Sequence, residues 1–363
     1  MTTLSRTTHP VDLSVAPWTM HEFFAGSGLV AYGLKGMFCP VWSSDICEKK
    51  AAVYRANFAG RHFVLEDIKN VCGADLPFAH LSWASFPCQD LSLAGMLGGI
   101  DARRSGLVWE WLRVLREMQQ RPAVLVVENV AGLLCAQNGE SYQRLHHALG
   151  DLGYQSGAVV IDAARFVPQS RPRVFVIALR EGMQPPQELT DSEPNWLHNK
   201  NAAKLGATLP RWIWWRADEP ARRTSNLSDV LDLTLPYDKD GLLRMVPQRH
   251  QNKLDSLKDV VATGYRRTRD GRQCLELRFD GIAGCLRTPK GGSSKQFLVV
   301  KRAGEAHARA LAPREAARLM GAPDTFVLPG TPNDGYRAMG DAVALPVATF
   351  IGASFLSKLM EVA

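Results

Sequence analysis

Apolar positions in the first half of the chain form short uninterrupted runs that are separated by amphipathic stretches. The runs predict buried strands at 19–25, 38–44, 81–85, 123–127 and 174–179. The stretches between them carry apolar residues at helical spacing and predict helices over 49–58, 105–120 and 140–152. This alternation is typical of an α/β protein whose parallel sheet is covered on both faces, with ligands bound at the carboxyl ends of the strands.

The pattern changes after residue 180. From there to residue 310 the chain is rich in Pro, Gly and Trp and loses the alternation of strands and helices. Two alternating runs in this region predict strands, at 273–279 and 296–301. Helical spacing returns after Ala312 and again over 341–359. We therefore expect two domains, a main one formed by 1–180 and 311–363 and a smaller one at 181–310.

Composition narrows the class of protein. Of the 363 residues, 46% are hydrophobic and 22% are charged, which is typical of a globular chain. No apolar run approaches the roughly 18 residues that cross a bilayer, and the N-terminus lacks a signal-peptide pattern. Seven cysteines without a C-x-x-C pair indicate neither a metal site nor a disulfide framework. A soluble intracellular protein without a membrane partner is expected.

Positive charge is concentrated in one segment. Residues 261–310 hold eleven Lys/Arg and four Asp/Glu, a surplus equal to the net charge of +7 of the whole chain. Such a segment suits a surface that contacts phosphates, although a solvated face would carry the same charge.

Three acidic or glycine-rich positions indicate a nucleoside pocket. The sequence HEFFAGSG at 21–28 follows the first predicted strand, and its glycines let the backbone approach a ligand at a helix N-terminus. Asp45 ends the second predicted strand, where a carboxylate can accept hydrogen bonds from ribose hydroxyls. Asp67 ends a third short apolar run. A simple tight turn is the alternative for the glycines alone.

Reactive residue types follow the next strands. Cys88, held by Pro87 at a strand end, is a candidate nucleophile, although a buried structural cysteine has the same local pattern. Glu128 ends the strand at 123–127, where apolar surroundings suit a carboxyl group that donates a proton near neutral pH. Arg171 and Arg173 precede another strand and offer fixed guanidinium donors, or surface ion pairs.

The order and spacing of these motifs resemble the DNA (cytosine-5) methyltransferases of the compact bacterial or phage type. The matching segments are FAGSG, the Asp45 segment ending in YRANF, the Asp67–Ile68 pair, SFPCQDLSLAG, RSGLVWE, ENV, QSRPR, PREAARLMGAPDTF and GDAVALPVA. The resemblance covers nearly the whole chain outside 181–270.

This resemblance implies a Rossmann-like methyltransferase fold with a target-recognition domain inserted at 181–310, S-adenosyl-L-methionine as the cofactor, and double-stranded DNA as the substrate. The implied catalytic residues are Cys88, Glu128, Arg171 and Arg173. The implied cofactor-binding residues are Phe24, Ala25, Gly26, Ser27, Gly28, Asp45, Ile46, Asp67, Ile68, Pro87, Asp341 and Ala342. The expected DNA-contacting residues are Gln89, Ser92, Arg104, Gln169, Arg287, Thr288 and Lys290.

Four positions depart from the family's usual pattern. Asp341 stands where Asn is usual, and an Asp cannot donate as an amide does. His80 replaces a common acid and Ser85 a glycine, and Cys285 precedes Leu286 where Thr-Leu is usual. None of these is among the four implied catalytic residues.

Three alternatives remain beside DNA methylation. Cytosine-5 methylation of tRNA uses the same chemistry, but Phe86 before Pro87 and the long basic insert favour DNA. A non-catalytic DNA-binding protein would be expected to lack a catalytic residue, and a nicotinamide-dependent oxidoreductase rests on the glycine turn and Asp45 alone. We further expect a monomer in the cytoplasm, associated with the nucleoid, that accompanies a restriction or phage-defence system.

Overall fold

The structure is a computed structural model that describes residues 10–87, 106–238, 241–288 and 295–362. The chain divides into two compact units. The large unit contains Pro10–Asp162, Pro172–Pro220 and Val347–Ala363, and the small unit contains Ala163–Arg171 and Ala221–Pro346. Their bounds differ from the expected division, because 181–220 belong to the large unit whereas 163–171 and 311–346 belong to the small one.

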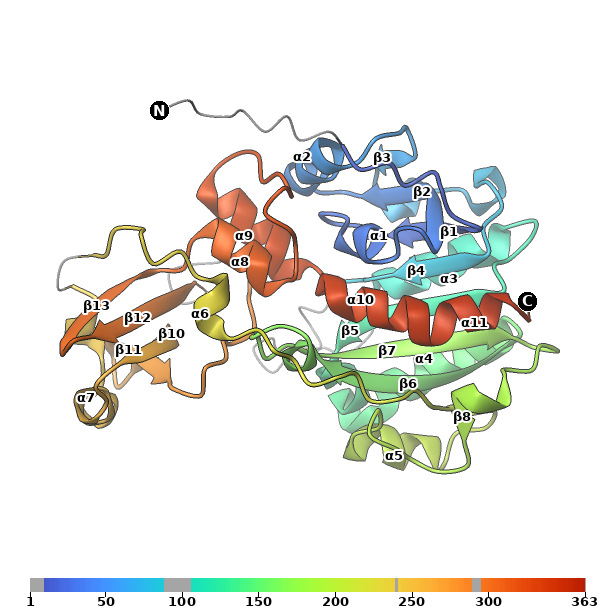
Figure 1. The fold of residues 1–363 in the computed structure, drawn as a ribbon. Coiled ribbons are helices and arrows are strands. Elements are labelled where there is room, and N and C mark those ends of the chain that lie inside the picture. The colour runs from blue at the N-terminus through green and yellow to red at the C-terminus, as the bar shows by residue number, and fades with distance from the viewer. Residues whose placement is uncertain (1–9, 88–105, 239–240, 289–294, 363) are drawn as a thin grey trace. The chain divides into compact units, whose positions relative to one another are not determined.

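A seven-stranded sheet in the order β3-β2-β1-β4-β5-β7-β6 forms the centre of the large unit (Figure 1). Its strands are β1 (Trp18–Phe23), β2 (Phe38–Asp45), β3 (Phe63–Leu65), β4 (Leu81–Ala84), β5 (Val124–Val130), β6 (Tyr154–Asp162) and β7 (Pro172–Arg180). The five strands from β3 to β5 are parallel. Four of them, β1, β2, β4 and β5, are the strands that the alternating pattern predicts, whereas β3 was not predicted. A short antiparallel pair, β8 (Thr190–Asp191) and β9 (Trp214–Trp215), completes the strands of this unit.

The expectation of an all-parallel sheet is wrong at one edge. Strand β7 runs antiparallel to β5, and β6 runs antiparallel to β7. The chain passes from β6 to β7 through 163–171 without the crossover helix that a parallel connection requires, so the two strands pair as antiparallel neighbours. As a result Arg173, near the start of β7, lies opposite Val130 at the carboxyl end of β5.

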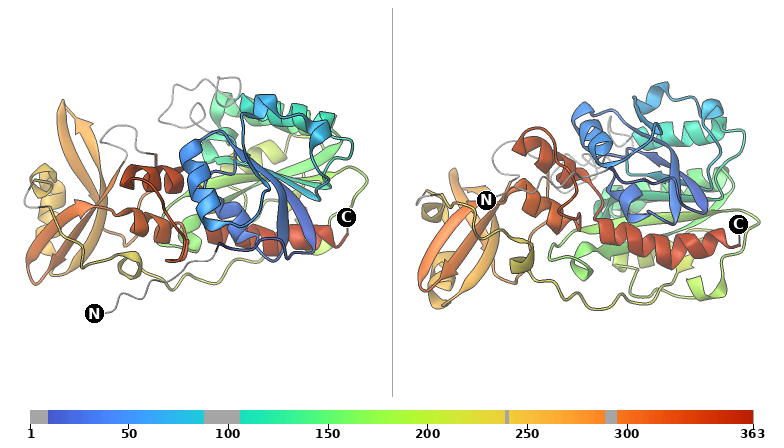
Figure 2. Two further views of the ribbon diagram at one scale, coloured as in Figure 1. Left: turned by 90° about the horizontal axis from the view of Figure 1, so that it is seen from above. Right: turned by 45° about the horizontal axis from the view of Figure 1, so that its top comes forward.

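Helices cover both faces of this sheet (Figure 2). Helices α3 (Leu107–Glu117) and α4 (Glu140–Asp151) pack on one face with the nearby α5 (Lys200–Gly206). On the other face lie α1 (Leu29–Gly33) and the C-terminal helices α10 (Leu345–Ile351) and α11 (Ser357–Met360). Helix α10 is bonded to α1, because the Thr349 hydroxyl donates to the Gly33 carbonyl. Helix α2 (Glu48–Asn57) follows β2.

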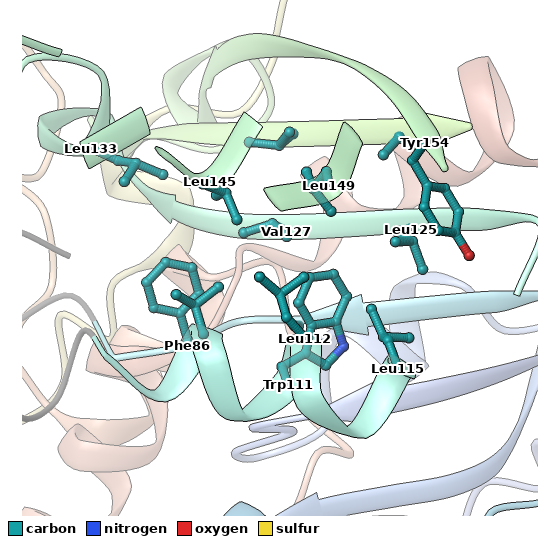
Figure 3. Close-up of a cluster of buried hydrophobic side chains, with 14 of the residues drawn as sticks. Phe86, Trp111, Leu112, Leu115, Leu125, Val127, Leu133, Leu145, Leu149 and Tyr154 are labelled. Atoms are coloured by element: carbon teal, nitrogen blue, oxygen red, sulfur yellow. The ribbon is translucent and has the colours of Figure 1, made fainter. Parts of the chain in front are cut away.

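The core under α3 and α4 holds the chain that leads to the predicted nucleophile. Phe86, which follows β4, is 2% exposed and packs in this core. Figure 3 shows its ring beside Trp111 and Leu112 of α3, with Val127 of β5 across the core. This burial fixes the chain two residues before Cys88.

The helix expected over 341–359 is interrupted. Helix α9 (Pro332–Asp341) ends at Asp341, where the expected helix was to begin. Helix α10 begins at Leu345, and Gly352–Leu356 forms a π-helical turn before α11. By length and composition the stretch Pro332–Met360 could cross a membrane, but 56% of its most apolar window is buried inside the protein. Such burial is typical of a core helix.

The small unit is built on a four-stranded antiparallel sheet in the order β11-β10-β12-β13 (Figure 1). Its strands are β10 (Val260–Arg269), β11 (Arg272–Arg278), β12 (Gln296–Arg302) and β13 (Glu305–Ala310), and its helices are α6 (Leu227–Val230), α7 (Gln248–Ser256), α8 (Pro313–Leu319) and α9. The predicted strands at 273–279 and 296–301 are confirmed as β11 and β12, whereas β10 and β13 were not predicted. One face of the sheet buries Ala262, Leu275 and Phe297 against Leu254 of α7.

Candidate active site

A glycine-rich turn joins β1 to α1 in a conformation that few residues adopt. Phe24, Gly26 and Gly28 have φ angles of 57°, 58° and 82°, in the left-handed region. A Cβ on Gly28 would lie 2.3 Å from the Phe58 ring, so only glycine fits there. At Gly26 a Cβ would meet nothing closer than 3.9 Å, so the space beside this backbone is open. Left-handed backbone at a non-glycine residue such as Phe24 is common at ligand-binding sites.

The Asp45 carboxylate connects this turn to the end of β2. Its Oδ2 accepts from the Gly26 N–H at 2.9 Å, and its Oδ1 accepts from the Cys47 N–H at 2.7 Å. Each carboxylate oxygen keeps a lone pair for a hydroxyl donor. The next side chain, Ile46, is 66% exposed, which is unusual for a large aliphatic residue and leaves an apolar surface beside the acid.

Asp67 and Ile68 follow β3 at the same edge. Asp67 caps a short 3₁₀ turn, with its Oδ1 accepting from the Lys69 N–H at 3.1 Å. The Ile68 side chain is buried in the core, so only its backbone remains for the predicted contact with a ligand.

Asn129 holds the segment that precedes Cys88, a role that the sequence analysis missed. Its Nδ2 donates to the Phe86 carbonyl at 3.0 Å, and its Oδ1 accepts from the Val130 N–H at 2.8 Å. The amide is buried, and it fixes the backbone at Phe86 from the end of β5. The signal was its place beside Glu128 in the ENV motif.

Glu128 and Arg173 form an ion pair across β5 and β7. The Arg173 Nε lies 3.2 Å from the Glu128 Oε1, and the two side chains are 14% and 8% exposed. Glu128 pairs with Phe175 in the sheet, so Arg173 is its diagonal neighbour on the same face. The reversed direction of β7 is what places these groups together.

Arg171 is buried within the small unit. Its guanidinium donates to the carbonyls of Leu286 at 2.9 Å, Gly340 at 2.9 Å and Ala342 at 2.7 Å. It therefore joins two segments of that unit. Its expected support of Cys88 remains a prediction, as do the cofactor contacts expected of Asp341 and Ala342.

The expectation that Gln169 contacts DNA has no support in its placement. Its side chain is completely buried, because Nε2 donates to the Leu319 carbonyl at 2.8 Å and Oε1 accepts from the Leu286 N–H at 3.0 Å. Arg287 is exposed and Thr288 half-buried, as a surface contact requires. Five predicted site residues lie outside the described residues, namely Cys88, Gln89, Ser92, Arg104 and Lys290.

Two departures from the family's usual pattern have structural roles. The Ser85 hydroxyl accepts from the Trp83 indole N–H at 3.0 Å, and the His80 Nδ1 accepts from the Thr19 N–H at 3.1 Å. Both bonds stabilise the start and end of β4 rather than take part in chemistry.

Comparison with known families decides the class of enzyme. The model of the family "C-5 cytosine-specific DNA methylase" matches residues 18–357. This protein belongs to that family. It is a DNA (cytosine-5) methyltransferase that uses S-adenosyl-L-methionine as the methyl donor.

Relatives and solved structures agree with this assignment. The chain is 27% identical to the Type II methyltransferase M.Bsp6I of Bacillus sp. (strain RFL6) over 93% of this chain and 98% of that protein. It is 27% identical to the Type II methyltransferase M.HpaII of Haemophilus parainfluenzae, covering 94% and 90%. Its fold is similar to that of S. pombe Dnmt2 methyltransferase, with a TM-score of 0.59 and 19% identity over 95% and 98% of the two chains. A putative DNA modification methyltransferase from an E. coli prophage has a TM-score of 0.57 and 19% identity over 95% and 99%.

The residues at the glycine-rich turn fit this cofactor. The open backbone at Gly26 leaves space for the methionine moiety, Asp45 has lone pairs for ribose hydroxyls, and the exposed Ile46 offers an apolar surface to the adenine ring. We therefore expect the turn and these two side chains to hold the cofactor when it binds.

We expect Asp45→Ala to weaken the binding of S-adenosyl-L-methionine by about 1–3 kcal/mol, the usual cost of losing a charged hydrogen bond. The loss should exceed that of a surface carboxylate, because Asp45 also orders the N–H groups of Gly26 and Cys47. Isothermal titration calorimetry measures the change, with Asp75→Ala as the control because Asp75 is exposed. Unchanged affinity in Asp45→Ala would exclude this role.

Glu22, beside the turn on β1, is a buried carboxyl group. It is 1% exposed, and a backbone hydrogen bond from Ala31 offsets only part of the effect of its burial. Burial raises the pKa of Glu22 to about 8. The folded state therefore favours the neutral acid, and this preference stabilises it fully below the unfolded pKa and is lost as the pH rises toward 8.

We expect Glu22→Gln to remove most of this pH dependence. Since one pKa unit corresponds to about 1.4 kcal/mol, the wild type should lose roughly 3 kcal/mol of unfolding free energy relative to the variant between pH 5 and pH 8. Urea unfolding at the two pH values measures the difference. Glu193→Gln, which changes an exposed carboxylate of the same unit, is the control and should match the wild type. Parallel pH profiles for wild type and Glu22→Gln would contradict the prediction.

Proposed function

We propose that this enzyme methylates carbon 5 of a cytosine flipped out of a specific sequence in double-stranded DNA, through a covalent bond to Cys88. The observation that carries the proposal is the Glu128–Arg173 pair at 3.2 Å, on the strand end whose next residue, Asn129, donates to the Phe86 carbonyl. An acid and a fixed cation match what a cytosine ring requires at nitrogen 3 and at its carbonyl oxygen.

The chemistry follows from the electronic structure of cytosine. Carbon 5 is a poor nucleophile, so the Cys88 thiolate adds to carbon 6 while Glu128 donates a proton to ring nitrogen 3. Arg173 donates hydrogen bonds to the ring carbonyl oxygen, and Arg171 supports the Cys88 segment. When bound, S-adenosyl-L-methionine would supply the electrophilic methyl group for carbon 5. Carbon 5 then loses its proton to a base such as water, the bond between carbon 6 and sulfur breaks to release the thiolate, and ring nitrogen 3 returns its proton to Glu128.

Base flipping is required because the neighbouring base pairs cover both faces of a stacked cytosine. Extrusion costs a few kcal/mol, which contacts with DNA must offset. The segment 91–105 lies outside the described residues. From its glycines Gly95, Gly98 and Gly99 we expect a loop that closes over the flipped base, with a rigid glycine-rich turn as the alternative. The small unit is expected to read the target sequence, with Arg287 on a base edge, Thr288 beside it and Lys290 on a phosphate.

A role in DNA modification is supported by the relatives. M.Bsp6I and M.HpaII are named Type II methyltransferases, so we propose that this enzyme accompanies a restriction or phage-defence system. We expect it to act as a monomer in the bacterial or phage-infected cytoplasm, in association with the nucleoid.

Bisulfite sequencing of DNA from cells that express the protein tests the proposal. The expected result is methylated cytosine at one position of a fixed short motif. Incubation of purified enzyme with labelled cofactor and either duplex DNA or tRNA separates the two polymers, and transfer to tRNA alone would overturn the DNA assignment.

A further inference from the structure

The backbone of 284–286 in the small unit is held by buried side chains. Gln296 bonds both the N–H and the carbonyl of Gly284. Gln169 accepts from the Leu286 N–H at 3.0 Å, and Arg171 donates to the Leu286 carbonyl at 2.9 Å. These buried bonds fix the backbone on both sides of Cys285, so the segment that ends at Arg287 is rigid.

Close packing against Gly340 limits the segment from another side. A Cβ at Gly340 would lie 2.5 Å from the Arg287 carbonyl carbon and 2.7 Å from the Thr288 nitrogen. The backbone of Arg287 therefore rests directly on the Gly-Asp turn at the end of α9.

Tyr265 of β10 packs against the same segment. Its hydroxyl donates to the Cys285 carbonyl, and burial raises the pKa of Tyr265, so the phenol stays a donor at physiological pH. A Cβ on Gly284 would lie 2.6 Å from the Tyr265 ring, so the ring can pack here only because residue 284 has no side chain.

Two guanidinium groups lie over the Tyr265 ring. The Cζ atoms of Arg267 and Arg287 are 4.9 Å and 5.8 Å from the ring centroid, within the range of cation–π attraction. Among the described residues neither group forms an ion pair or a hydrogen bond, whereas Arg269 is bound by Glu276 and Arg278 by Asp280. The two stacked arginines thus keep their donors for a ligand.

A cavity of about 420 Å³ lies beside this stack. Its lining includes Tyr265 and Arg267 together with Arg249 and Arg278. Glu276 is the one carboxylate in the lining, and it is already engaged by Arg269 at 2.8 Å. Of the three arginines, Arg278 is bound by Asp280 and Arg249 lies 3.7 Å from Glu276, so Arg267 is the one in this lining that keeps its donors for a phosphate group.

We propose that Tyr265 is a positioning residue for DNA recognition, which holds Arg287 for contact with a base edge and Arg267 for contact with a backbone phosphate. Stacking on one rigid ring sets both guanidinium groups in place before DNA binds, which reduces the entropy lost on binding. This inference rests on the proposed function, because it assigns residues to the reading of the same DNA target.

The test is methylation of a random-sequence duplex library, followed by sequencing of the modified sites. We expect Tyr265→Leu to relax the preferred base at the same motif position as Arg287→Ala, and the double variant to relax it no further. Tyr265→Phe keeps the aromatic face and should retain the motif. Arg267→Ala should retain the motif but lower the slope of log affinity against log salt by about one unit.

Arg269→Ala is the matched control. It removes an arginine of the same strand whose guanidinium already bonds to Glu276, so the variant should keep the wild-type motif. Thermal unfolding and cofactor affinity verify that each variant is folded. If Tyr265→Leu does not fold, Arg267→Ala and Arg287→Ala decide alone. An unchanged motif in Tyr265→Leu or Arg287→Ala, or an unchanged salt slope in Arg267→Ala, overturns the inference. Absence of any sequence-specific methylation by the wild type would instead contradict the proposed function.

Discussion

Replacing Cys88 by alanine is expected to reduce methyl transfer to background while cofactor and DNA binding persist. The change removes one sulfur from a segment whose backbone is fixed two residues earlier, where Phe86 is buried in the core and bonded to Asn129. Without a thiolate, carbon 5 has no route to become a nucleophile. Transfer of labelled methyl groups to duplex DNA measures the loss.

Trapping distinguishes the covalent mechanism from a merely structural cysteine. DNA that contains 5-fluorocytosine should form a denaturation-resistant adduct with the wild type, because fluorine cannot leave carbon 5 as a proton does. The Cys88→Ala variant should form none. Cys72→Ala, which alters an exposed cysteine, is the control and should behave as the wild type. Turnover by Cys88→Ala near the wild-type rate would refute the assignment.

The second large effect is expected at Glu128. Glu128→Gln keeps the shape of the side chain but cannot transfer a proton to ring nitrogen 3, so we expect kcat to fall by roughly 10²–10⁴-fold, the usual contribution of a general acid. Single-turnover kinetics with saturating DNA and cofactor measure this step. Cofactor affinity should stay unchanged, since Asp45 and the glycine-rich turn are untouched.

Arg173→Ala supplies the comparison for this pair. It removes the guanidinium that lies 3.2 Å from Glu128. The variant should therefore impair both the positioning of the Glu128 carboxyl group and the hydrogen bonds to the carbonyl oxygen of the cytosine ring. The exposed Glu140 at the start of α4 provides the control, and Glu140→Gln should retain wild-type kcat. A Glu128→Gln enzyme with kcat within a few-fold of the wild type would show that protonation of the ring does not depend on this residue.

Much of the catalytic unit follows from the sequence because its signals are local. Buried parallel strands are read from apolar runs, and the five strands from β3 to β5 occur as this pattern indicates, apart from the short β3. The motifs at strand ends also predict which groups meet, because the carboxyl ends of parallel strands share one edge. Asp45 reaches the glycine-rich turn for this reason.

Other features depend on contacts between distant segments. Apolar periodicity does not report strand direction, so the reversal of β7 that carries Arg173 to Glu128 was not predicted. The pattern also does not report which polar side chain turns inward. Gln169 and Arg171 sit in a motif expected at the site, yet both satisfy backbone groups inside the small unit.

The sequence by itself therefore determined the family, the position along the chain of the strands that carry the motifs, and the chemical groups available for methyl transfer. Only the tertiary structure showed that Glu128 forms an ion pair with Arg173, that Asn129 bonds to the chain before Cys88, and that two arginines stack on Tyr265. The physical reason is that residue type and spacing encode local conformation and burial, whereas strand direction and the partners of buried polar groups are set by the packing of segments that lie far apart in the chain.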